Sequence, residues 1–550
     1  LRFYTSAIFI LFLINGFSQN KTLEKLPQEK VLLTTDRTIY FAGEQIWLKT
    51  ICRLTAGTDS LSRVMYVELL DKKAKPVVQK KIRVINGLST GVIEVPEDIL
   101  TGVYYIRAYT QYMRNFEKEL FYTTELTIIN ADLPAKEIIQ TIAKDTVVDE
   151  KSGLVQINMP SAVFIPNASV EVELTGKESK EVSVSVVKKG SYESNKVGIH
   201  KFYKISAADA EKKLKWYPEI RSVSITGKVV DKQSGEPVKN MLVFASVIDS
   251  VKQFHVAKTN DEGTFAFALM HLHDNHQVYI GSDRDATILI NPDFAAGLPT
   301  AAYATLKMDS TKLDLLNKMY TNSQVMDIYK DETVTSKTYL DTLPDPFQTS
   351  METILFKDYV ALPTMTDMFN EIIPYTKVKT RKEGVYIQLA DKKDKTFFEN
   401  TLILLDNIPF HDHAALLNIP PAKINSVGVI AGRYVYGGEI LNGVISIKSK
   451  DGNLAGLPLP GDIVVVDYIT YNPDVKAVYE KTNGFSANKP GFKNTLYWNP
   501  YVELKDGKQI IQFAVGNEAS DYDIVVRGVD ANGNLFTTIK TITVLKPSAN

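Results

Sequence analysis

Residues 31–49 read VLLTTDRTIYFAGEQIWLK, and this stretch decides the fold class. An apolar run from Val31 predicts a strand that ends at the polar pair Asp36-Arg37. The chain turns again at Ala42-Gly43, and Ile46 and Leu48 then alternate toward one face, as in a half-buried strand. Short runs of this kind, rich in Val, Ile, Thr and Tyr and separated by Gly, Asp and Asn, make up most of the chain. The pattern predicts antiparallel β-sandwiches.

Two more stretches extend this strand pair into a module of residues 29–130. Residues 66–70 (YVELL) predict a strand closed by a charged turn, and residues 100–110 (LTGVYYIRAYT) predict a turn that leads into a long strand. The Asp-x-x-x-Tyr-x-x-Gly-Glu opening at residues 36–44 and the Gly-x-Tyr-x-Ile-Arg-Ala strand at residues 102–108 resemble the MG2 domain of the α-macroglobulin family. A generic immunoglobulin-like sandwich is the alternative.

The thioester of protease-trapping macroglobulins is not expected in this chain. Those proteins use a Cys-Gly-Glu-Gln sequence, and Gly43-Glu44-Gln45 matches only part of it because Ala42 precedes it. The resemblance therefore does not imply covalent trapping.

Two other segments show weaker sandwich patterns. Alternating residues at 155, 157 and 159 and again at 182, 184 and 186 predict a second macroglobulin-like sandwich over residues 151–190, with a polar connector to residue 220. Residues 489–546, which contain the strand 522–528 (YDIVVRG), predict a C-terminal macroglobulin-like sandwich. Helical patterns are few and cover residues 206–216, 309–320 and part of 358–373.

A third module is predicted over residues 221–291. It opens with residues 225–238 (ITGKVVDKQSGEPV) and continues to residues 259–267 (TNDEGTFAF). Gly235 fits a hairpin turn, and Gly263 fits a turn position with positive φ. The segment resembles the carboxypeptidase regulatory-like domain, a small non-catalytic sandwich found ahead of outer-membrane receptors.

Residues 351–451 predict a small α+β module. A buried strand and turn at 401–409, a short helix and strand at 416–430, and a Gly-rich loop and strand at 436–447 resemble the plug domain of TonB-dependent outer-membrane receptors. Asn407 replaces the usual Gly, and residues 439–441 replace smaller ones. The residues that carry this plug-like motif are Asp406, Pro409, Pro420, Ile424, Val427, Tyr436, Gly437, Asn442 and Gly443.

A receptor barrel is not expected to follow this plug-like module. About 22 spanning strands of about ten residues each need more than ~220 residues, and fewer than half that number follow Asp451. We therefore predict a mainly β fold: a multi-domain string of immunoglobulin-like or macroglobulin-type sandwiches with one small α+β plug-like domain and no membrane barrel.

The N-terminus predicts export. Arg2, the apolar core of residues 7–14 and the small residues Gly16 and Ser18 form the pattern of a signal peptide over residues 1–18. No other segment is long and apolar enough for a membrane helix. Cys52 is the single cysteine and lies in an alternating segment, so it is predicted to be a small buried hydrophobe.

Composition argues against several functions. Lys+Arg (63) and Asp+Glu (64) nearly cancel, which disfavours nucleic acid or an anionic membrane surface as a partner. His271, His273 and His276 are weak candidates for a metal site, because alternate residues of a strand share a face. His411-Asp412-His413 follows Pro409 and predicts a solvated turn. No catalytic set and no cofactor are predicted.

The sequence therefore predicts a non-catalytic binding or scaffold protein that is periplasmic or associated with the outer membrane. Its plug-like domain would dock to an outer-membrane transport or assembly complex, and exposed sheet edges could bind peptides by strand addition. One alternative is a truncated or degenerate TonB-dependent receptor without its barrel. Another is a metalloprotein or hydrolase that uses the His271 cluster.

Overall fold

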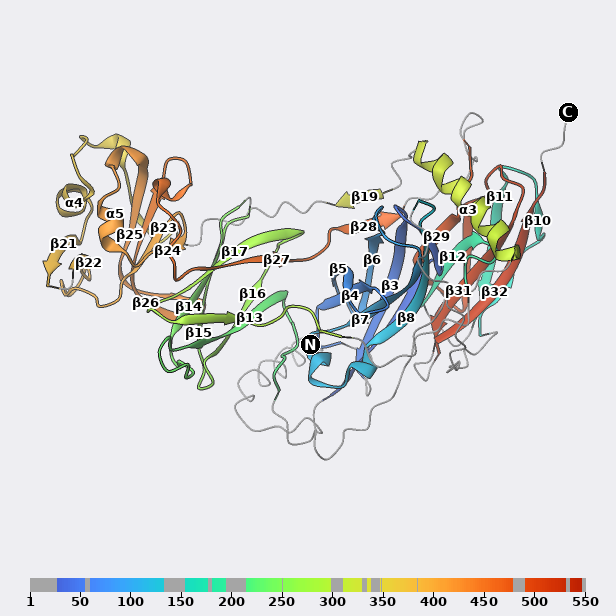
Figure 1. Ribbon diagram of the computed structural model, residues 1–550, viewed down its shortest axis with the longest axis horizontal. Coiled ribbons are helices and arrows are strands. Elements are labelled where there is room, and N and C mark those ends of the chain that lie inside the picture. The colour runs from blue at the N-terminus through green and yellow to red at the C-terminus, as the bar shows by residue number, and fades with distance from the viewer. Residues whose placement is uncertain are drawn as a thin grey trace. The chain divides into compact units, whose positions relative to one another are not determined.

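The computed structural model describes the chain in thirteen stretches, which form two units (Figure 1). One unit comprises Leu1–Arg221, Phe294–Thr338 and Tyr471–Asn550, and the other comprises Ser222–Asp293 and Tyr339–Thr470. The signal peptide predicted at residues 1–18 lies outside the described residues, as does most of the helix predicted at 206–216. The described residues are 27–54, 60–132, 154–176, 181–193, 214–249, 251–297, 310–328, 334–337, 347, 349–382, 384–477, 490–530 and 535–546.

The first sandwich of the first unit contains the stretch that begins at Val31. Its three-stranded antiparallel sheet has the order β1-β3-β6, and Ile46 and Leu48 of β3 are fully buried, as their alternation predicts. Cys52 is also buried, and burial raises the pKa of its thiol. The facing sheet has the order β2-β8-β7-β4-β5. The strands are β1 (Glu29–Thr35), β2 (Ile39–Phe41), β3 (Gln45–Leu54), β4 (Val64–Leu70), β5 (Pro76–Arg83), β6 (Leu88–Glu94), β7 (Gly102–Tyr109) and β8 (Tyr122–Ile129), with 3₁₀ turns at Tyr112–Asn115 and Lys118–Leu120.

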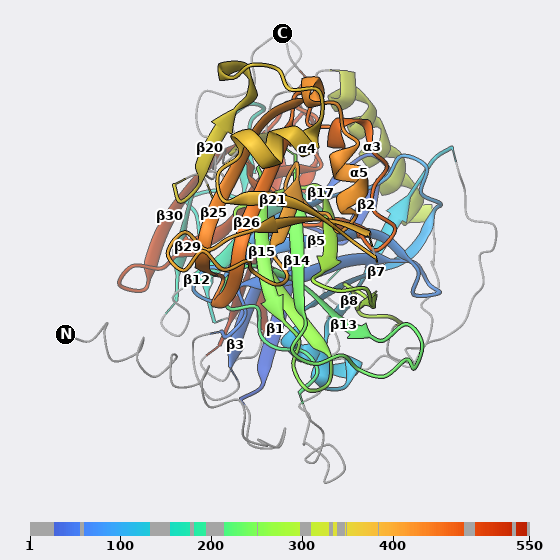
Figure 2. The ribbon, with the colours of Figure 1, turned by 90° about the vertical axis from the view of Figure 1, so that its left-hand side faces the viewer.

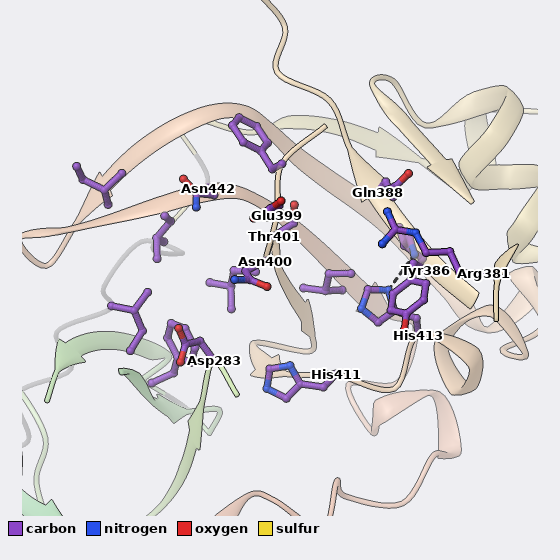
Figure 3. Close-up of a pocket in the computed structure, with 18 residues that line it drawn as sticks. Asp283, Arg381, Tyr386, Gln388, Glu399, Asn400, Thr401, His411, His413 and Asn442 are labelled. Carbon is purple, nitrogen blue, oxygen red and sulfur yellow. Dashed lines mark hydrogen bonds between the residues drawn. The ribbon is translucent and has the colours of Figure 1, made fainter. Parts of the chain in front are cut away.

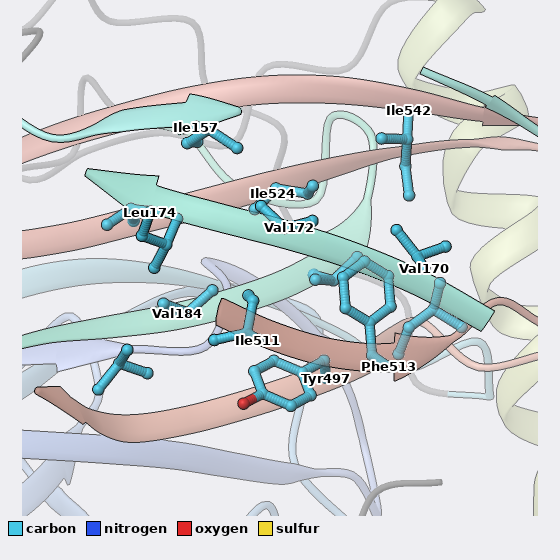
Figure 4. Close-up of a cluster of buried hydrophobic side chains, with 14 of the residues drawn as sticks. Ile157, Val170, Val172, Leu174, Val184, Tyr497, Ile511, Phe513, Ile524 and Ile542 are labelled. Atoms are coloured by element: carbon cyan, nitrogen blue, oxygen red, sulfur yellow. The ribbon is translucent and has the colours of Figure 1, made fainter. Parts of the chain in front are cut away.

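A single second sandwich replaces the two that the sequence predicts at 151–190 and 489–546. Its sheets have the orders β10-β32-β31-β12-β29 and β30-β11-β9, so each contains strands from both segments. Val182, Val184 and Val186 of β12 share one core with Ile511, Phe513 and Ile524 (Figure 4). The strands are β9 (Gln156–Asn158), β10 (Val163–Phe164), β11 (Ser169–Thr175), β12 (Glu181–Lys188), β29 (Thr495–Glu503), β30 (Lys508–Ala514), β31 (Asp521–Val529) and β32 (Leu535–Val544).

The prediction of two sandwiches is wrong for a physical reason. Neither segment has enough strands to cover its own apolar face: residues 154–188 supply four of these strands and residues 495–544 supply the other four. Their apolar faces are buried only when the two segments form the two sheets together.

One helix, α3 (Ser310–Ile328), contacts the first sandwich and also Asn494, which precedes β29 of the second. It begins close to the predicted position and extends eight residues past the predicted end. Leu316 and Met319 lie on one face and pack against Ile39, Phe41 and Ile129 of the first sandwich. A short two-stranded sheet, β19 (Val334–Lys337) with β28 (Asp474–Ala477), completes the unit's described elements.

The second unit begins with a third sandwich. Its sheets have the orders β16-β13-β18 and β15-β14-β17-β27. Gly235 and Gly263 have φ of 71° and 72°, as predicted, and a Cβ at Gly263 would lie 2.6 Å from the carbonyl oxygen of Val229. β27 returns from a distant part of the sequence to pair with β17, a pairing that the sequence analysis did not predict. The strands are β13 (Val223–Val230), β14 (Leu242–Val247), β15 (Gln253–Lys258), β16 (Thr264–Leu269), β17 (Asn275–Ser282), β18 (Thr287–Ile290) and β27 (Val464–Ile469).

The same unit contains an α+β module, whose five-stranded sheet has the order β20-β25-β26-β23-β24. β23 and β26 are parallel, and the other neighbouring pairs are antiparallel. α4, α5 and the hairpin β21–β22 lie over one face of this sheet (Figure 2), where Met365, Phe369 and Leu416 pack against Val427 and Ile447. The elements are β20 (Glu352–Leu355), α4 (Met365–Asp367), a π-helical turn (Met368–Ile372), β21 (Thr376–Arg381), β22 (Gly384–Leu389), β23 (Leu402–Leu405), β24 (Ile408–Pro409), α5 (His413–Leu417), β25 (Ile424–Tyr436) and β26 (Glu439–Ser449), with 3₁₀ turns at Phe356–Asp358, Pro421–Lys423 and Leu454–Gly456.

The protein is therefore mainly β, with several packed sheets and one small α+β module, as the sequence predicts. Among the described helices, none combines the length and the apolar character needed to cross a membrane.

Candidate functional site

The turn between β23 and β24 contains the first residues of the predicted plug-like motif. Asp406 and Asn407 have φ of 51° and 71°, which is the backbone of a two-residue hairpin turn in which both central residues are left-handed. Asparagine tolerates this conformation, so Asn407 can replace the expected glycine. The Asp406 carboxylate accepts hydrogen bonds from Ser449 N (2.8 Å), Ser449 Oγ (2.6 Å) and Leu454 N (2.8 Å). Asp406 thus ties the turn to the end of β26.

The next motif residues start and fill β25. Pro420 caps the 3₁₀ turn that precedes the strand, while Ile424 and Val427 are fully buried in the core of the α+β module. Pro409 ends β24, opposite Leu404. These four residues form the framework of the module, and none of them lines the module's pocket.

The remaining motif residues lie along the β25–β26 hairpin. Gly437 has φ of 62° at its tip, and Gly443 has φ of 74° beside a register shift between the two strands. A Cβ at Gly443 would lie 2.5 Å from Leu389 Cδ2, so this position requires glycine. Tyr436 Oη donates a hydrogen bond to the carbonyl oxygen of Phe254 (2.7 Å), on β15 of the third sandwich.

The third sandwich and the α+β module are joined by an aromatic cluster. Each ring of this cluster has its centroid within 6.3 Å of at least one other, and the rings belong to Phe244, Phe254, Phe347, Tyr434 and Tyr436. Ser246 Oγ donates to the carbonyl oxygen of Asn407 (2.7 Å), which adds a polar contact. The predicted plug-like module is therefore packed firmly against its neighbour.

A pocket of about 460 Å³ lies between these two modules (Figure 3). Its apolar lining residues include Phe244, Leu402 and Ile403. The polar lining residues are Asp283, Arg381, Tyr386, Gln388, Glu399, Asn400, Thr401, His411, His413 and Asn442. Of the predicted motif residues, only Asn442 lines this pocket.

Both histidines of the pocket are held by backbone groups. His411 Nε2 donates to the carbonyl oxygen of Ser282 (2.7 Å), and His413 Nδ1 accepts from Ile387 N (2.9 Å). Burial, with the neighbouring His411, lowers the pKa of His413, so its ring is neutral at pH 7 and carries its proton on Nε2. The sequence prediction of a solvated turn holds for His411, whose side chain is 40% exposed. It is wrong for His413, which is partly buried and begins α5 beside β22.

The acidic side of the pocket is formed by Asp283. Burial raises the pKa of its carboxyl group, and the nearby Arg284 opposes this shift. Asp283 Oδ1 lies 3.6 Å from Arg284 Nε in an ion pair, and Thr401 Oγ1 is buried without a hydrogen-bond partner in the described part of the chain. The pocket can therefore donate and accept hydrogen bonds to a small polar molecule. Among the described residues, the hydrogen bonds of these two histidines go to backbone groups and not to a hydroxyl group, so the two rings do not form a hydroxyl–imidazole pair in this pocket.

A separate histidine, His255 on β15, makes the stability of the second unit depend on pH. Burial lowers its pKa from 6.5 to about 4. Because the folded protein favours the neutral ring, this stability is complete above pH 6.5 and is lost as the pH falls toward 4. We expect wild type to lose about 2–3 kcal/mol more than His255→Gln between pH 7 and pH 4, measured by urea unfolding. His271→Gln at an exposed position is the control, and equal losses in wild type and His255→Gln would contradict the prediction.

The His271 cluster does not have the geometry that the metal hypothesis assumes. Residues 271–274 form a bend with φ of 59° at His271 and 68° at Asp274, so His271 and His273 do not alternate along a strand. His276 contacts Asp249 through Nδ1 and the carbonyl oxygen of His273 through Nε2 (2.8 Å). Within the described residues, no group of three or more His, Cys, Asp or Glu side chains is placed to hold a metal ion.

Sequence patterns could not have found the pocket. Asp283 follows β17, whereas His411 and His413 come from a loop of another module about 130 residues later in the chain. Only the packing of the two modules brings them together. A pair of histidines two residues apart after a buried strand was the single available signal.

Comparisons with known proteins do not assign this chain to a family. No protein-family model and no curated protein matches the sequence. Among solved structures, a Salmonella α2-macroglobulin reacted with methylamine aligns over 96% of this chain and 40% of its own, with 8% identity and a TM-score of 0.25. An Escherichia coli α2-macroglobulin activated by porcine elastase aligns over 94% and 44%, with 10% identity and a TM-score of 0.24. The E. coli adhesin FdeC aligns over 48% and 65%, with 9% identity and a TM-score of 0.15.

This chain thus spans less than half the length of the α2-macroglobulins that it matches. The TM-scores are too low to support an argument about this protein. Its mainly β fold is assigned from its own sheets.

Proposed function

We propose that this chain is a non-catalytic binding or scaffold protein of a Gram-negative cell envelope, which associates with an outer-membrane transport or assembly complex through the α+β module. The plug-like sequence pattern of residues 351–451 and the signal-like N-terminus are the starting points for this proposal. The alternative, a truncated or degenerate TonB-dependent receptor, rests on the same plug-like pattern and signal-like N-terminus. A barrel reading frame directly downstream of the codon for Asn550 would favour it.

The observation that carries the proposal is the outer half of the β25–β26 hairpin. β20 pairs only with residues 426–429 of β25, and β23 pairs only with residues 444–447 of β26. Beyond these pairings the hairpin continues as a two-stranded arm. Val435 and Ile440 form a cross-strand pair on this arm and are 69% and 59% exposed.

The arm is rigid because its other face is anchored. Side chains alternate along a strand, so Tyr434 and Tyr436 lie on the face opposite Val435. Tyr436 packs on Phe254 and Phe347 and hydrogen-bonds the backbone of Phe254. An exposed apolar pair on an anchored arm fits a protein-binding surface better than a solvated turn.

Purification of the tagged full-length chain from mildly solubilised membranes tests the proposal. We expect an outer-membrane protein to co-purify. The double variant Val435→Lys/Ile440→Lys should lower its recovery at least tenfold, because burying two ammonium groups in the interface is unfavourable. The matched control is Ile539→Lys on β32, where the side chain is 44% exposed. A chain that stays monomeric and recovers no membrane protein would refute the proposal.

A further inference from the structure

Strand β30 has one free edge in the described part of the chain. It pairs only with β11, at one end of the sheet β30-β11-β9. Val515 N donates to Ala168 O (2.9 Å) and Gly176 N donates to Gly507 O (2.9 Å), so both ends of the ladder are hydrogen-bonded pairs. Such pairs recur at every second residue of an antiparallel ladder. Gln509, Ile511 and Phe513 therefore turn their backbone groups toward β11. Ile510, Gln512 and Ala514 turn theirs to the free edge. There the carbonyl oxygen of Ile510 accepts a solvent-exposed hydrogen bond from the side chain of Gln509 (Nε2, 2.9 Å), which an added strand would displace.

Apart from Lys508 at its start, this edge lacks the features that usually protect a sheet edge from another strand. Residues 509–514 (QIIQFA) contain no proline and no charged side chain, and the pairing with β11 runs without a bulge. The edge strand β5 of the first sandwich, in contrast, begins at Pro76 and carries Lys80 and Lys81. β29, which lies beside β30, contains Pro500 and a register shift.

A groove runs between the free edges of β29 and β30. Its volume is about 480 Å³, and it is lined by residues of both strands: Tyr497, Asn499, Tyr501, Val502, Glu503, Gln509, Ile510, Ile511 and Gln512. Tyr497 and Ile511 lie between the strands that carry them (Figure 4), and the Tyr497 ring is 5.8 Å from that of Phe513. Glu503 is the only charged lining residue.

We infer that the free edge of β30 binds an extended segment of a partner protein by strand addition. The segment would pair with Ile510 and Gln512 and place apolar side chains at every second position into the groove. It would have no acidic residue facing Glu503, because two carboxylates would repel each other there. The inference rests on the proposed role as a binding protein, but it assigns a second surface, separate from the β25–β26 arm.

The chain itself supplies a suitable probe. β11 (Ser169–Thr175, SVEVELT) already pairs with the other edge of β30, and its Val and Leu residues alternate with Glu. When Val and Leu face the groove, both Glu side chains face away from it. A fluorescein-labelled peptide of this sequence is titrated with the full-length chain and followed by fluorescence anisotropy. A peptide of the same composition in which Val and Glu no longer alternate is the control.

A proline substitution can test binding at the free edge without disrupting the hydrogen bonds that hold the sandwich together. Gln512→Pro removes an N–H that points away from β11, so the ladder within the sandwich stays complete. We expect Gln512→Pro to weaken peptide binding at least tenfold, with its thermal midpoint close to that of wild type. Gln512→Ala keeps the N–H and should bind within twofold of wild type. The amides of Ile510 and Gln512 should gain protection from hydrogen exchange when the peptide binds.

The inference is overturned if wild type does not bind the peptide, if the scrambled peptide binds equally well, or if Gln512→Pro has no effect. A concentration-dependent dimer that Gln512→Pro abolishes would also overturn it, because the occupant would be a second copy. If Gln512→Pro does not fold, the inference is tested instead with Ile510→Pro and with hydrogen exchange on the wild-type protein. The Val435→Lys/Ile440→Lys variant should bind the peptide normally, so failure of the membrane-partner proposal is distinguishable from failure of this inference.

Discussion

Replacing Glu68 with alanine should lower the free energy of unfolding of the first sandwich by about 3–5 kcal/mol. Glu68 and Arg107 face each other on β4 and β7, and each side chain is only 1% exposed. Arg107 Nε donates to Glu68 Oε2 at 2.9 Å. Without Glu68, the guanidinium group stays buried with no opposing charge, which costs more than the loss of an ordinary hydrogen bond.

The surroundings of Arg107 leave little room for relaxation. Its Nη2 also donates to the carbonyl oxygen of Ala295 (2.7 Å), and its guanidinium lies over the rings of Tyr109 and Phe121, 5.2 Å and 5.8 Å from their centroids. A side chain held by these contacts cannot turn out to water without opening the sheet. We therefore expect the cost to lie in the upper part of that range.

Urea unfolding of the purified chain, followed by the fluorescence of Trp47 in the same sandwich, measures this loss. Lys189→Ala is the control, because the Lys189–Asp521 pair (3.5 Å) is about half exposed and should contribute less than about 0.5 kcal/mol. The double variant Glu68→Leu/Arg107→Met should recover at least half of the loss, since it removes both charges. A loss below about 1 kcal/mol for Glu68→Ala would show that the pair does not stabilise the sandwich.

The sequence predicts individual strands better than their partners. Alternation correctly marks Ile46 and Leu48 as buried, and the turn pattern correctly marks Gly263 as a position with positive φ. Alternation defines which face of a strand is apolar, but it carries no information about which strand covers that face. The pairing of β11 with β30, more than 300 residues apart, could not be derived from it.

The same limit applies to the candidate site. The pattern around Asp406 and Tyr436 predicts a turn and a hairpin, and the structure contains both. The contacts of this turn and hairpin with Ser246 and Phe254, and the contact of His411 with Ser282, depend on the packing of one module on another. A sequence motif therefore predicts the local backbone conformation, whereas the pocket forms only where the two modules pack together.

Replacing Glu44 with alanine should lower the free energy of unfolding of the first unit by about 3 kcal/mol and uncouple its two sandwiches. Glu44 Oε2 accepts from Phe41 N (2.8 Å) and forms an ion pair with Arg37 (2.5 Å), whose side chain is 5% exposed. Its Oε1 accepts from Asn494 Nδ2 (3.0 Å), which precedes β29 of the second sandwich. One carboxylate thus joins two sandwiches.

This network gives a physical reason for the spacing of the Asp-x-x-x-Tyr-x-x-Gly-Glu opening. Asp36 accepts from Tyr40 Oη (2.7 Å) and from Thr495 Oγ1 (2.8 Å), so it also reaches the second sandwich. Ser323 of α3 donates to Glu44 as well. The motif therefore places the buried Asp36 carboxylate and the Glu44 carboxylate, whose side chain is 16% exposed, at a junction of the two sandwiches.

Two tryptophans allow the uncoupling to be measured directly. Trp47 reports on the first sandwich and Trp498 on the second, in variants where the other tryptophans are replaced by phenylalanine. In the wild-type background both probes should show coincident urea transitions, and Glu44→Ala should separate them.

Glu94→Ala, at an exposed position on β6, is the control and should change stability by less than about 0.5 kcal/mol. A Glu44→Ala/Asn494→Ala double-mutant cycle should give a coupling energy above about 0.5 kcal/mol. Coincident transitions in Glu44→Ala would mean that apolar contacts of α3 with Ile39 and Phe41, not the carboxylate, hold the sandwiches together.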